Sequence, residues 1–527
     1  MNRSQTKYSP IPSVTAAALL VCLATLAVTA PAPAQGPPQP TQGQQHAQAN
    51  PLPLYGRGGG NGSVTAVEAP IAGTTNSVAT INPTVQVEGP YAGSSSGAAN
   101  LPSPGKLSLR DAIDRGLKYN LGALGQSHAV RLAQGQSQVA RSALLPNASG
   151  YLAETLNQVN LAAEGVKIHI PIPGFSFPTI VGPYNNIDLR GSVSQSVLDL
   201  TAWNNYRSSS DLYRAAQFSA SDARDAIVLA VSGTYLQVIA TRERVKSAHA
   251  QLDTATALYQ QTLQKRTAGL SPQVDVDRSE VEQLTQQQRV ISLEAELAKQ
   301  MIALARMTGL PPNQNYELTD DVPFAPAPAL TFDNALQQAF AGRSDIKAAQ
   351  AQVRAAEHAL TAARDERIPS LSVNGNYGAI GTNPAQAKET YSAAATLSIP
   401  IWQGGRTEGD IKQAEASLAQ RQSELDDLKG QVESDVRNAF LDLEAATGQV
   451  ALAQRNLQVN RETLDLTRQR FDAGVTDNVE VVQAQESLTA AELDVINSVF
   501  AHNVAKLSLA RAVASGTGNL QQFLNFQ

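Results

Sequence analysis

The sequence predicts a mainly helical protein with a smaller β component, built from two copies of one unit. Two turn motifs carry this prediction, because Ala-Gly-Leu-Ser at Gly269 and Ala-Gly-Val-Thr at Gly474 are each followed by a Val-acid-Val run. The two glycines lie 474 − 269 = 205 residues apart, and a long helical pattern without proline precedes each of them. Such a duplication means two copies of one supersecondary unit, so we look for function in the way that the copies assemble.

The N-terminus has the features of a secretory signal. Basic Arg3 and Lys7 precede an apolar stretch over 15–30, and an Ala-Pro-Ala cleavage motif follows it. We therefore expect residues 1–34 to be removed and the mature chain to leave the cytoplasm. Cys22 is the only cysteine and lies inside this signal, so we expect no disulfide or thiol chemistry in the mature chain.

The charge of the chain excludes some classes of partner. Removing the signal, which carries two positive charges, takes the net charge from −6 to −6 − 2 = −8. This acidity argues against nucleic-acid binding, which needs a basic face. Beyond the signal we find no apolar run long enough for a transmembrane helix, so any membrane crossing must be made by strands.

Residues 35–105 differ in composition from the rest of the chain. They are rich in Pro, Gly, Gln, Ser and Ala, and their only charged residues are Arg57, Glu68 and Glu88. Because this segment has no sustained apolar period, it cannot bury enough surface to offset its chain entropy. We expect a flexible periplasmic tether, and the alternative is a segment that binds peptidoglycan or a partner.

Ordered structure is predicted in two repeats, 106–325 and 326–516, followed by a C-terminal tail, 517–527. Each repeat opens with a similar seven-residue motif, Leu-Ser-Leu-Arg-Asp-Ala-Ile or Leu-Thr-Phe-Asp-Asn-Ala-Leu. Ser108 and Thr331 are the expected N-caps of a short helix. A second helix follows in each repeat and is expected to end shortly before a proline.

Four extended runs follow these helices, two in each repeat. Apolar and polar residues alternate over 187–197, 371–377 and 391–401, and less regularly over 151–161. This period of two over about ten residues suits membrane-barrel strands, and the alternative is an ordinary half-buried sheet. Four strands cannot close a barrel, and an open edge is not allowed in lipid. The strands therefore belong either to a soluble sheet or to a barrel shared between chains.

The helices are the larger signal. Residues 204–268 contain no proline, and Pro400 is the last proline of the chain. At about 1.5 Å per residue, such a helix is on the order of 90 Å long, so it needs neighbouring helices. Apolar residues recur every seven positions, which indicates a left-handed coiled coil. These residues are Val238, Val245, Leu252 and Tyr259 in the first copy, and Leu443, Val450, Leu457, Leu464 and Phe471 in the second.

Each long helix is expected to end at its Ala-Gly turn and to return as a second helix, over 274–308 and 479–514. Ser271 and Thr476 are expected to cap these return helices, with an acidic residue in each first turn.

Nothing in the sequence predicts an enzyme, a cofactor or a metal site. The six histidines are scattered, and no two of them have metal-ligand spacing. We find no phosphate-binding glycine loop and no nucleophile elbow. The carboxylates lie on helical faces beside Lys, Arg and Gln, which is typical of solvated helices.

Together these features resemble the TolC-like outer-membrane efflux proteins of Gram-negative bacteria. The resemblance covers about 107–516. It depends on the signal, the duplication, the strand pairs, the two turns, and the sequence Ile-Pro-Ile-Trp-Gln-Gly-Gly-Arg at 399–406, where strand passes into long helix.

The resemblance implies a homotrimer in the outer membrane with a long periplasmic extension. Each chain would give four strands to a twelve-stranded transmembrane β-barrel, continued by a coiled-coil barrel of twelve helices. The implied partners are outer-membrane lipid, a periplasmic adaptor (membrane fusion) protein, and an inner-membrane pump or ABC transporter. We expect passive export of small molecules and drugs. The alternatives are type I protein secretion, metal efflux, or, in another class, a non-conducting outer-membrane or secreted coiled-coil scaffold.

By the same resemblance, the two turns form the periplasmic tips that dock the adaptor's helical hairpins. A plain helix–turn–helix link is the alternative. The expected docking residues are Gly269, Leu270, Ser271, Gly474, Val475 and Thr476.

A periplasmic gate is expected beside these tips. In family members the segment after the second turn lines the closed aperture, often with acidic rings. Glu480 matches one acidic position, whereas Gln483 stands where well-known members have a second acid. Phe471 replaces a tyrosine that pairs with the acid equivalent to Asp275, so that hydrogen bond cannot form. The resemblance therefore implies a carboxylate ring from Glu480 with Val479, and the alternative is a solvated glutamate.

The loop 165–186 is unusually apolar and is interrupted by prolines and glycines. We expect it to be the extracellular loop of the first hairpin, either against lipid headgroups or over the barrel mouth.

Overall fold

A computed structural model describes most of the chain beyond the N-terminal region. The described residues are 64–71, 80–95, 105–163, 165, 178–312, 316–321, 323–327, 329–476, 478–513 and 523. All of them lie in one compact unit, Arg57–Gln527. The predicted signal, Cys22 and most of the apolar loop 165–186 lie outside the described residues.

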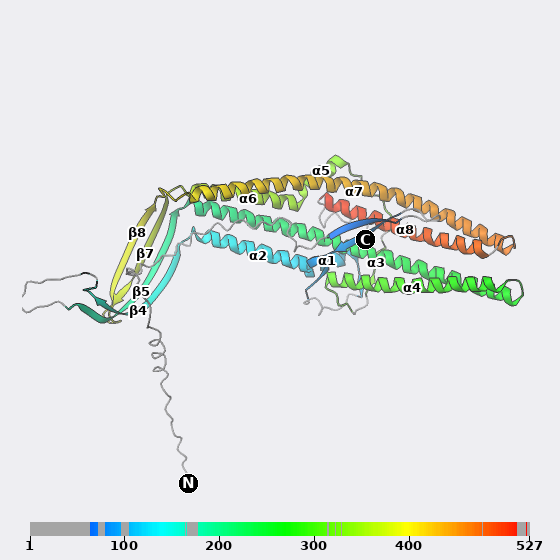
Figure 1. Cartoon of the computed structure of the whole chain (residues 1–527), viewed down its shortest axis with the longest axis horizontal. Coiled ribbons are helices and arrows are strands. Elements are labelled where there is room, and N and C mark those ends of the chain that lie inside the picture. Colours follow the sequence, from blue (N-terminus) through cyan, green and yellow to red (C-terminus); the bar gives the residue numbers. More distant parts are fainter. Residues whose placement is uncertain are drawn as a thin grey trace, which may run out of the picture. The chain divides into compact units, whose positions relative to one another are not determined.

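The helices and the four long strands of the two repeats follow one another in the same order (Figure 1). Two strands and a short turn of 3-10 helix come first: β1 (Val64–Ile71), β2 (Thr80–Val87) and η1 (Gly89–Ala92). The first repeat contains β3 (Lys106–Leu107), α1 (Leu109–Tyr119), α2 (Leu121–Ser142), β4 (Asn147–Asn160), β5 (Ile180–Leu198), α3 (Leu200–Thr267), α4 (Gln273–Thr308) and β6 (Glu317–Leu318). The second contains α5 (Phe332–Gly342), α6 (Ser344–Asp365), β7 (Ser370–Gly381), β8 (Lys388–Ser398), α7 (Arg406–Asp472) and α8 (Asn478–Ala512). The predicted duplication is confirmed.

Long helices dominate the unit. At about 1.5 Å per residue, the 68 residues of α3 span roughly 100 Å. α3 packs against α2, α4 and α6, and α7 packs against α6 and α8. The seven-residue repeat of α7 lies on its packed side, since Leu443, Val450 and Leu464 are buried.

Four antiparallel strands form one sheet in the order β4-β5-β7-β8. The four predicted strands are therefore confirmed. The outer strands of this order, β4 and β8, each pair on one side only within the described residues. The sheet thus has two open edges.

One face of this sheet is polar. Ser149, Ser192, Asn376 and Ser392 oppose one another in a single row across the four strands. The hydroxyl oxygens of Ser149 and Ser192 lie 2.7 Å apart, and the Asn376 amide donates to the Ser392 hydroxyl at 2.7 Å.

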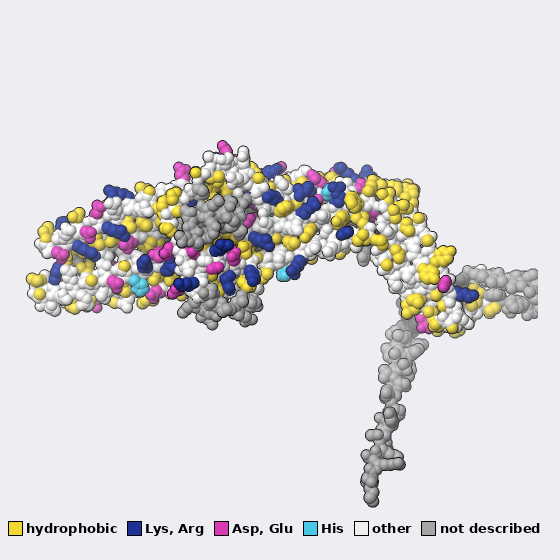
Figure 2. Space-filling model, turned by 180° about the vertical axis from the view of Figure 1, so that it is seen from behind, with side chains coloured by type: hydrophobic (Ala, Val, Ile, Leu, Met, Phe, Trp, Pro, Cys, Tyr) yellow, Lys and Arg dark blue, Asp and Glu magenta, His cyan; other side chains and the backbone are white. Residues whose placement is uncertain are grey.

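The other face is apolar, because successive residues of a strand point to opposite sides. Most of its large side chains are exposed in the single chain, whereas Ile187 and Leu371 are half-buried. The exposed ones include Leu152, Leu156, Leu189, Val193, Val373, Tyr377, Tyr391 and Leu397. In Figure 2 the charged side chains are spread over the helices, whereas the sheet carries mostly hydrophobic and uncharged ones.

Part of segment 35–105 differs from the expected tether. β1 and β2 form an antiparallel hairpin, and Val64, Val85 and Val87 pack against the core of the first repeat. Val85 packs against Gly233 of α3. A β-carbon added to Gly233 would lie 2.7 Å from the Cγ2 atom of Val85. Sequence patterning missed this hairpin because its burial comes from α3 and α8, which are distant in the chain.

One 18-residue window of α3 has the length and composition of a membrane span, although sequence analysis found no such run beyond the signal. Within the part of the chain that the structure describes, 78% of this window is buried. Packing against neighbouring helices therefore accounts for its hydrophobicity. The buried residues of this window include Ile227, Val231 and Leu236, which belong to the core of the first repeat.

α8 carries two fully buried titratable side chains that hold the connection between the repeats. The Lys506 ammonium donates to the Ala325 carbonyl at 2.8 Å, and the His502 ring lies 4.7 Å from the Phe324 ring. Burial lowers the pKa of Lys506 to about 8. Burial, followed by the charge of Lys506, lowers the pKa of His502 to about 4.

Candidate functional site: two helical tips and an open sheet

The two turns have the same backbone geometry. Gly269 and Gly474 adopt left-handed φ angles of 75° and 71°. Their amides donate to the carbonyls of Arg266 and Phe471 at 2.9 and 3.1 Å. In both turns the next amide also donates back to the last helical turn, at 2.8 Å from Leu270 and 2.9 Å from Val475. This pair of bonds is the Schellman motif, which requires the positive φ that glycine supplies.

Each turn presents one apolar side chain to solvent. Leu270 is 78% exposed and Val475 is 69% exposed. No atom lies within 4 Å of a β-carbon built on Gly269 or Gly474, so only the φ angle restricts substitution there. The predicted docking residues therefore form two equivalent, rigid, projecting tips.

The expected caps are wrong. The N-cap of α4 is Pro272, which has no capping side chain, and the Ser271 hydroxyl instead donates to Asp275 at 3.0 Å. α8 begins at Asn478, so Thr476 lies one residue too early to be its N-cap. Among the described residues its hydroxyl has no hydrogen-bond partner. The chain needs three residues, not two, to leave each glycine before the return helix begins.

The predicted gate residues lie on both hairpins, Asp275 on the α3–α4 hairpin and the others on the α7–α8 hairpin. Asp275 stays within the first hairpin, where it binds Ser271 and lies 3.9 Å from Arg278. Phe471 connects the two hairpins, because the Lys265 ammonium lies 3.9 Å from the centre of its ring. A cation over an aromatic face is attractive. The contact therefore links α3 to α7 near the tips.

Lys265 was missed by sequence reasoning. It lies in the last turn of α3, where the helix dipole stabilises a basic residue. This position was the only hint in the sequence that Lys265 matters. Lys265 also corresponds to Arg470 by the repeat shift, since 265 + 205 = 470.

The other gate residues lie within the second hairpin. Glu480 forms an ion pair with Arg470 at 3.2 Å, and both side chains are about half exposed. Such exposed pairs contribute at most about 1 kcal/mol. Val479 is half-buried, and Gln483 is exposed. Asp275 and Glu480 thus belong to different hairpins, and each has a partner within its own hairpin.

Comparisons with known proteins agree with this architecture. A model of the family described as "Outer membrane efflux protein" matches residues 124–310 and 335–515, one match in each repeat. The chain is 23% identical over 398 residues to the pyoverdine export outer membrane protein OpmQ of Pseudomonas aeruginosa, covering 73% of this chain and 81% of that protein. It is 22% identical over 333 residues to the outer membrane protein TolC of Vibrio cholerae, covering 61% and 75% of the two chains.

Solved outer-membrane channels share the fold. The CmeC channel of Campylobacter jejuni has a TM-score of 0.68 at 16% identity and covers 77% of this chain and 86% of its own. The open state of the MtrE channel of Neisseria gonorrhoeae has a TM-score of 0.64 at 16% identity and covers 88% and 99%. Since the family model matches more than half of the chain, the chain belongs to the outer membrane efflux protein family and is a TolC-type outer-membrane efflux channel, not an enzyme.

Proposed function

We propose that three copies of this chain form the passive exit duct of a tripartite efflux system. The duct carries small molecules, drugs among them, from a pump–adaptor complex across the periplasm and the outer membrane. The observation that carries the proposal is the four-stranded sheet with two open edges, one polar face and one exposed apolar face.

The sheet supports a shared barrel. Lipid leaves unpaired backbone groups unsatisfied, so a membrane-spanning sheet must close on itself. Pairing β8 of one copy with β4 of the next closes a barrel of 3 × 4 = 12 strands. Its apolar face then meets lipid and its polar face lines a water-filled lumen, as in membrane barrels.

Exposed apolar side chains on two helices support the same trimer. On α7 they recur every seven residues at Leu452, Val459 and Leu466. α4 carries another exposed apolar set, spaced by three and seven residues, at Val281, Leu284 and Ile291. A seven-residue apolar stripe is stable only when another helix covers it. We assign these stripes to the seams between copies.

The two tips dock the adaptor in this proposal. Leu270 and Val475 each offer an apolar side chain on a rigid turn, and the adjoining glycine leaves backbone accessible. Such a surface suits the end of the adaptor's helical hairpin, which needs a shallow apolar groove to bind in. The equivalence of the two turns allows the adaptor to bind both in the same way.

The gate lies next to the tips, with Glu480 as its acidic ring and Val479 as an apolar constriction. Three copies of Glu480 near one axis attract cations. The contact of Lys265 with Phe471 restrains the two hairpins in one copy and supports a closed arrangement.

The cargo assignment has separate support. Two relatives are named for pyoverdine export. The chain has only 3 Met and 6 His, without a tract that favours metal cargo. A passive duct has no catalytic residues and supplies no energy. The energy for export therefore comes from the pump.

Oligomeric state is the first test. Native mass spectrometry on protein from an outer-membrane fraction should give a trimer, and a soluble monomer or dimer would contradict the shared barrel.

Adaptor docking is tested by Gly474→Phe. The added β-carbon has no atom of the described chain within 4 Å, and the positive φ adds roughly 1–2 kcal/mol of local strain. We expect trimers at normal level in the outer membrane but loss of pump-dependent resistance. The control is Gly430→Phe, which puts the same bulk at an open position of α7 that is 474 − 430 = 44 residues away. Unchanged resistance with Gly474→Phe contradicts docking at this tip.

A further inference from the structure

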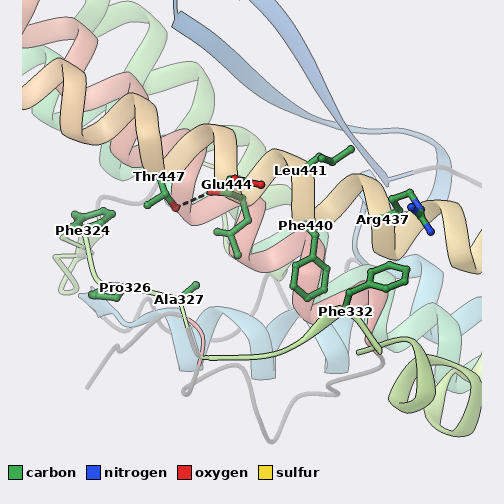
Figure 3. Close-up of a pocket in the computed structure, with 10 residues that line it drawn as sticks. Phe324, Pro326, Ala327, Phe332, Arg437, Phe440, Leu441, Glu444 and Thr447 are labelled. Carbon is green, nitrogen blue, oxygen red and sulfur yellow. Dashed lines mark hydrogen bonds between the residues drawn. The ribbon is translucent and has the colours of Figure 1, made fainter. Parts of the chain in front are cut away.

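A groove lies between α7 and the connection that joins the two repeats (Figure 3). Its volume is about 620 Å³, and it is lined mainly by aromatic and aliphatic side chains, including Phe324, Ala327, Phe332 and Phe440. The rings of Phe332 and Phe440 meet edge-on at 6.1 Å, and the Arg437 guanidinium lies 4.9 Å from the centre of the Phe332 ring. The groove is large and apolar enough to bind a short peptide segment.

The first repeat has an equivalent position, but there the residues that correspond to the groove lining are buried. The tip-to-tip shift of 205 relates Phe440 to Tyr235 (440 − 205 = 235), and the opening motifs relate Phe332 to Leu109. Tyr235 is fully buried, and so is Leu109. Both donate a hydrogen bond to one carboxylate, Asp320, at 2.8 and 2.6 Å.

The cover of the first repeat is the chain that follows α4. Tyr316 is buried, with its hydroxyl on the Met301 carbonyl at 2.5 Å. β6 then pairs in parallel with β3, and the Leu318 carbonyl accepts from Arg242 of α3 at 3.0 Å. Residues 316–321 therefore form a clasp that ties the start of α1 to α3.

The sequence that follows α8 has a similar spacing. Tyr316 stands seven positions after Gly309, and Phe523 stands seven positions after Gly516, a shift of 523 − 316 = 207. Phe523 is 5% exposed, as is Tyr316. It belongs to the core cluster of the second repeat, against which Phe332 and Phe440 also pack. Phe523 thus reaches the cluster that borders the groove.

We propose that the groove is the docking site of Leu524–Phe526 of the same chain, which forms the clasp of the second repeat. These residues lie outside the described part, directly after Phe523. They follow Phe523 as Glu317, Leu318 and Thr319 follow Tyr316, but here the outer two residues, Leu524 and Phe526, are the apolar ones. Three extended residues reach about 10 Å, and Phe526 supplies an apolar ring to a groove that three phenylalanines line.

The clasp fixes the connection between the repeats. Phe324 and Ala327 line the groove on one side, and Phe440 lines it on the other. A segment seated between them ties the connection to α7, as β6 ties β3 to α3. This inference does not rest on the export function, because it needs only the fold of one chain.

A disulfide experiment tests the proposal on the full-length protein purified from membranes. Phe526→Cys with Ala327→Cys should form a disulfide within one chain after mild oxidation, since bridged residues must have α-carbons within about 7 Å. The linked peptides are identified by mass spectrometry. Phe526→Cys with Thr447→Cys, on the opposite wall of the groove, is a second pair in case the first fails to fold.

The matched control pairs Phe526→Cys with Asp465→Cys. Asp465 is exposed on α7 but lies 465 − 447 = 18 residues beyond Thr447, roughly 27 Å along the helix. We expect no disulfide there. Absence of the disulfide in both groove pairs overturns the proposal. A disulfide that joins two copies also overturns it, because the groove then binds the tail of a neighbour.

Discussion

Lys506 allows a test of the buried connection between the repeats through pH. Its ammonium is fully buried and has one described acceptor, the Ala325 carbonyl. Burial lowers its pKa from 10.5 to about 8. Between these values the unfolded chain keeps the proton that the folded chain has lost. The unfolded state therefore binds more protons, and stability rises with pH in this window.

The size of the effect follows from the shift. A shift from 10.5 to about 8 corresponds to about 3 kcal/mol, at roughly 1.4 kcal/mol per pKa unit. The penalty is present in full below pH 8 and has largely gone near pH 10. His502, whose pKa burial lowers to about 4, changes charge only below this window. Burial raises the pKa of Tyr235 and Tyr316, so these residues lower stability only above pH 10.

Urea unfolding of the detergent-solubilised protein, followed by far-ultraviolet circular dichroism, measures this effect. We expect the unfolding midpoint of the natural chain to increase between pH 8 and pH 10. Lys506→Met keeps a side chain of similar length without the charge, so its midpoint should change little over the same range. Equal pH profiles for the two proteins would refute the reasoning.

Three further predictions use matched positions. Ser108→Ala should destabilise α1 by about 1 kcal/mol, because the Ser108 hydroxyl accepts a hydrogen bond from the Asp111 amide. Thr331→Ala should change the stability of α5 little, since the Thr331 side chain makes no such bond. Hydrogen exchange of the first-turn amides compares the two variants, and equal effects would contradict the capping role of Ser108. Gly233→Ala should release the β1–β2 hairpin to proteolysis, because its β-carbon meets Val85, whereas Gly448→Ala should stabilise α7 by up to about 1 kcal/mol. An equally protected hairpin would show that Val85 does not need the glycine. Glu480→Gln should reduce cation preference in planar-bilayer recordings, and an unaltered preference would count against an acidic gate.

The periodic parts of the fold could be predicted from the sequence. The four strands and the long helices repeat their patterns over many residues, so local errors average out. The exact turns could not, because capping depends on one residue: Ser271 binds Asp275 and not a backbone amide. The β1–β2 hairpin was missed because its burial comes from helices far along the chain.

The candidate site divides in the same way. Gly269 and Gly474 could be identified, because their positive φ follows from a local motif that occurs twice. The contact of Lys265 with Phe471 could not, since it joins two hairpins about two hundred residues apart. Groups that meet across such a distance leave no local pattern.

The nesting of Val85 over Gly233 has a consequence for the biogenesis of the channel. Val85 packs against a cluster that includes Phe500 and Val504 of α8, roughly four hundred residues later in the chain. During secretion the β1–β2 hairpin enters the periplasm early, whereas α8, one of the two helices that bury it, enters near the end. The hairpin can therefore reach its final position only after nearly the whole chain has crossed the inner membrane. Until then its apolar side chains stay exposed, and this is the interval in which a periplasmic chaperone is most useful.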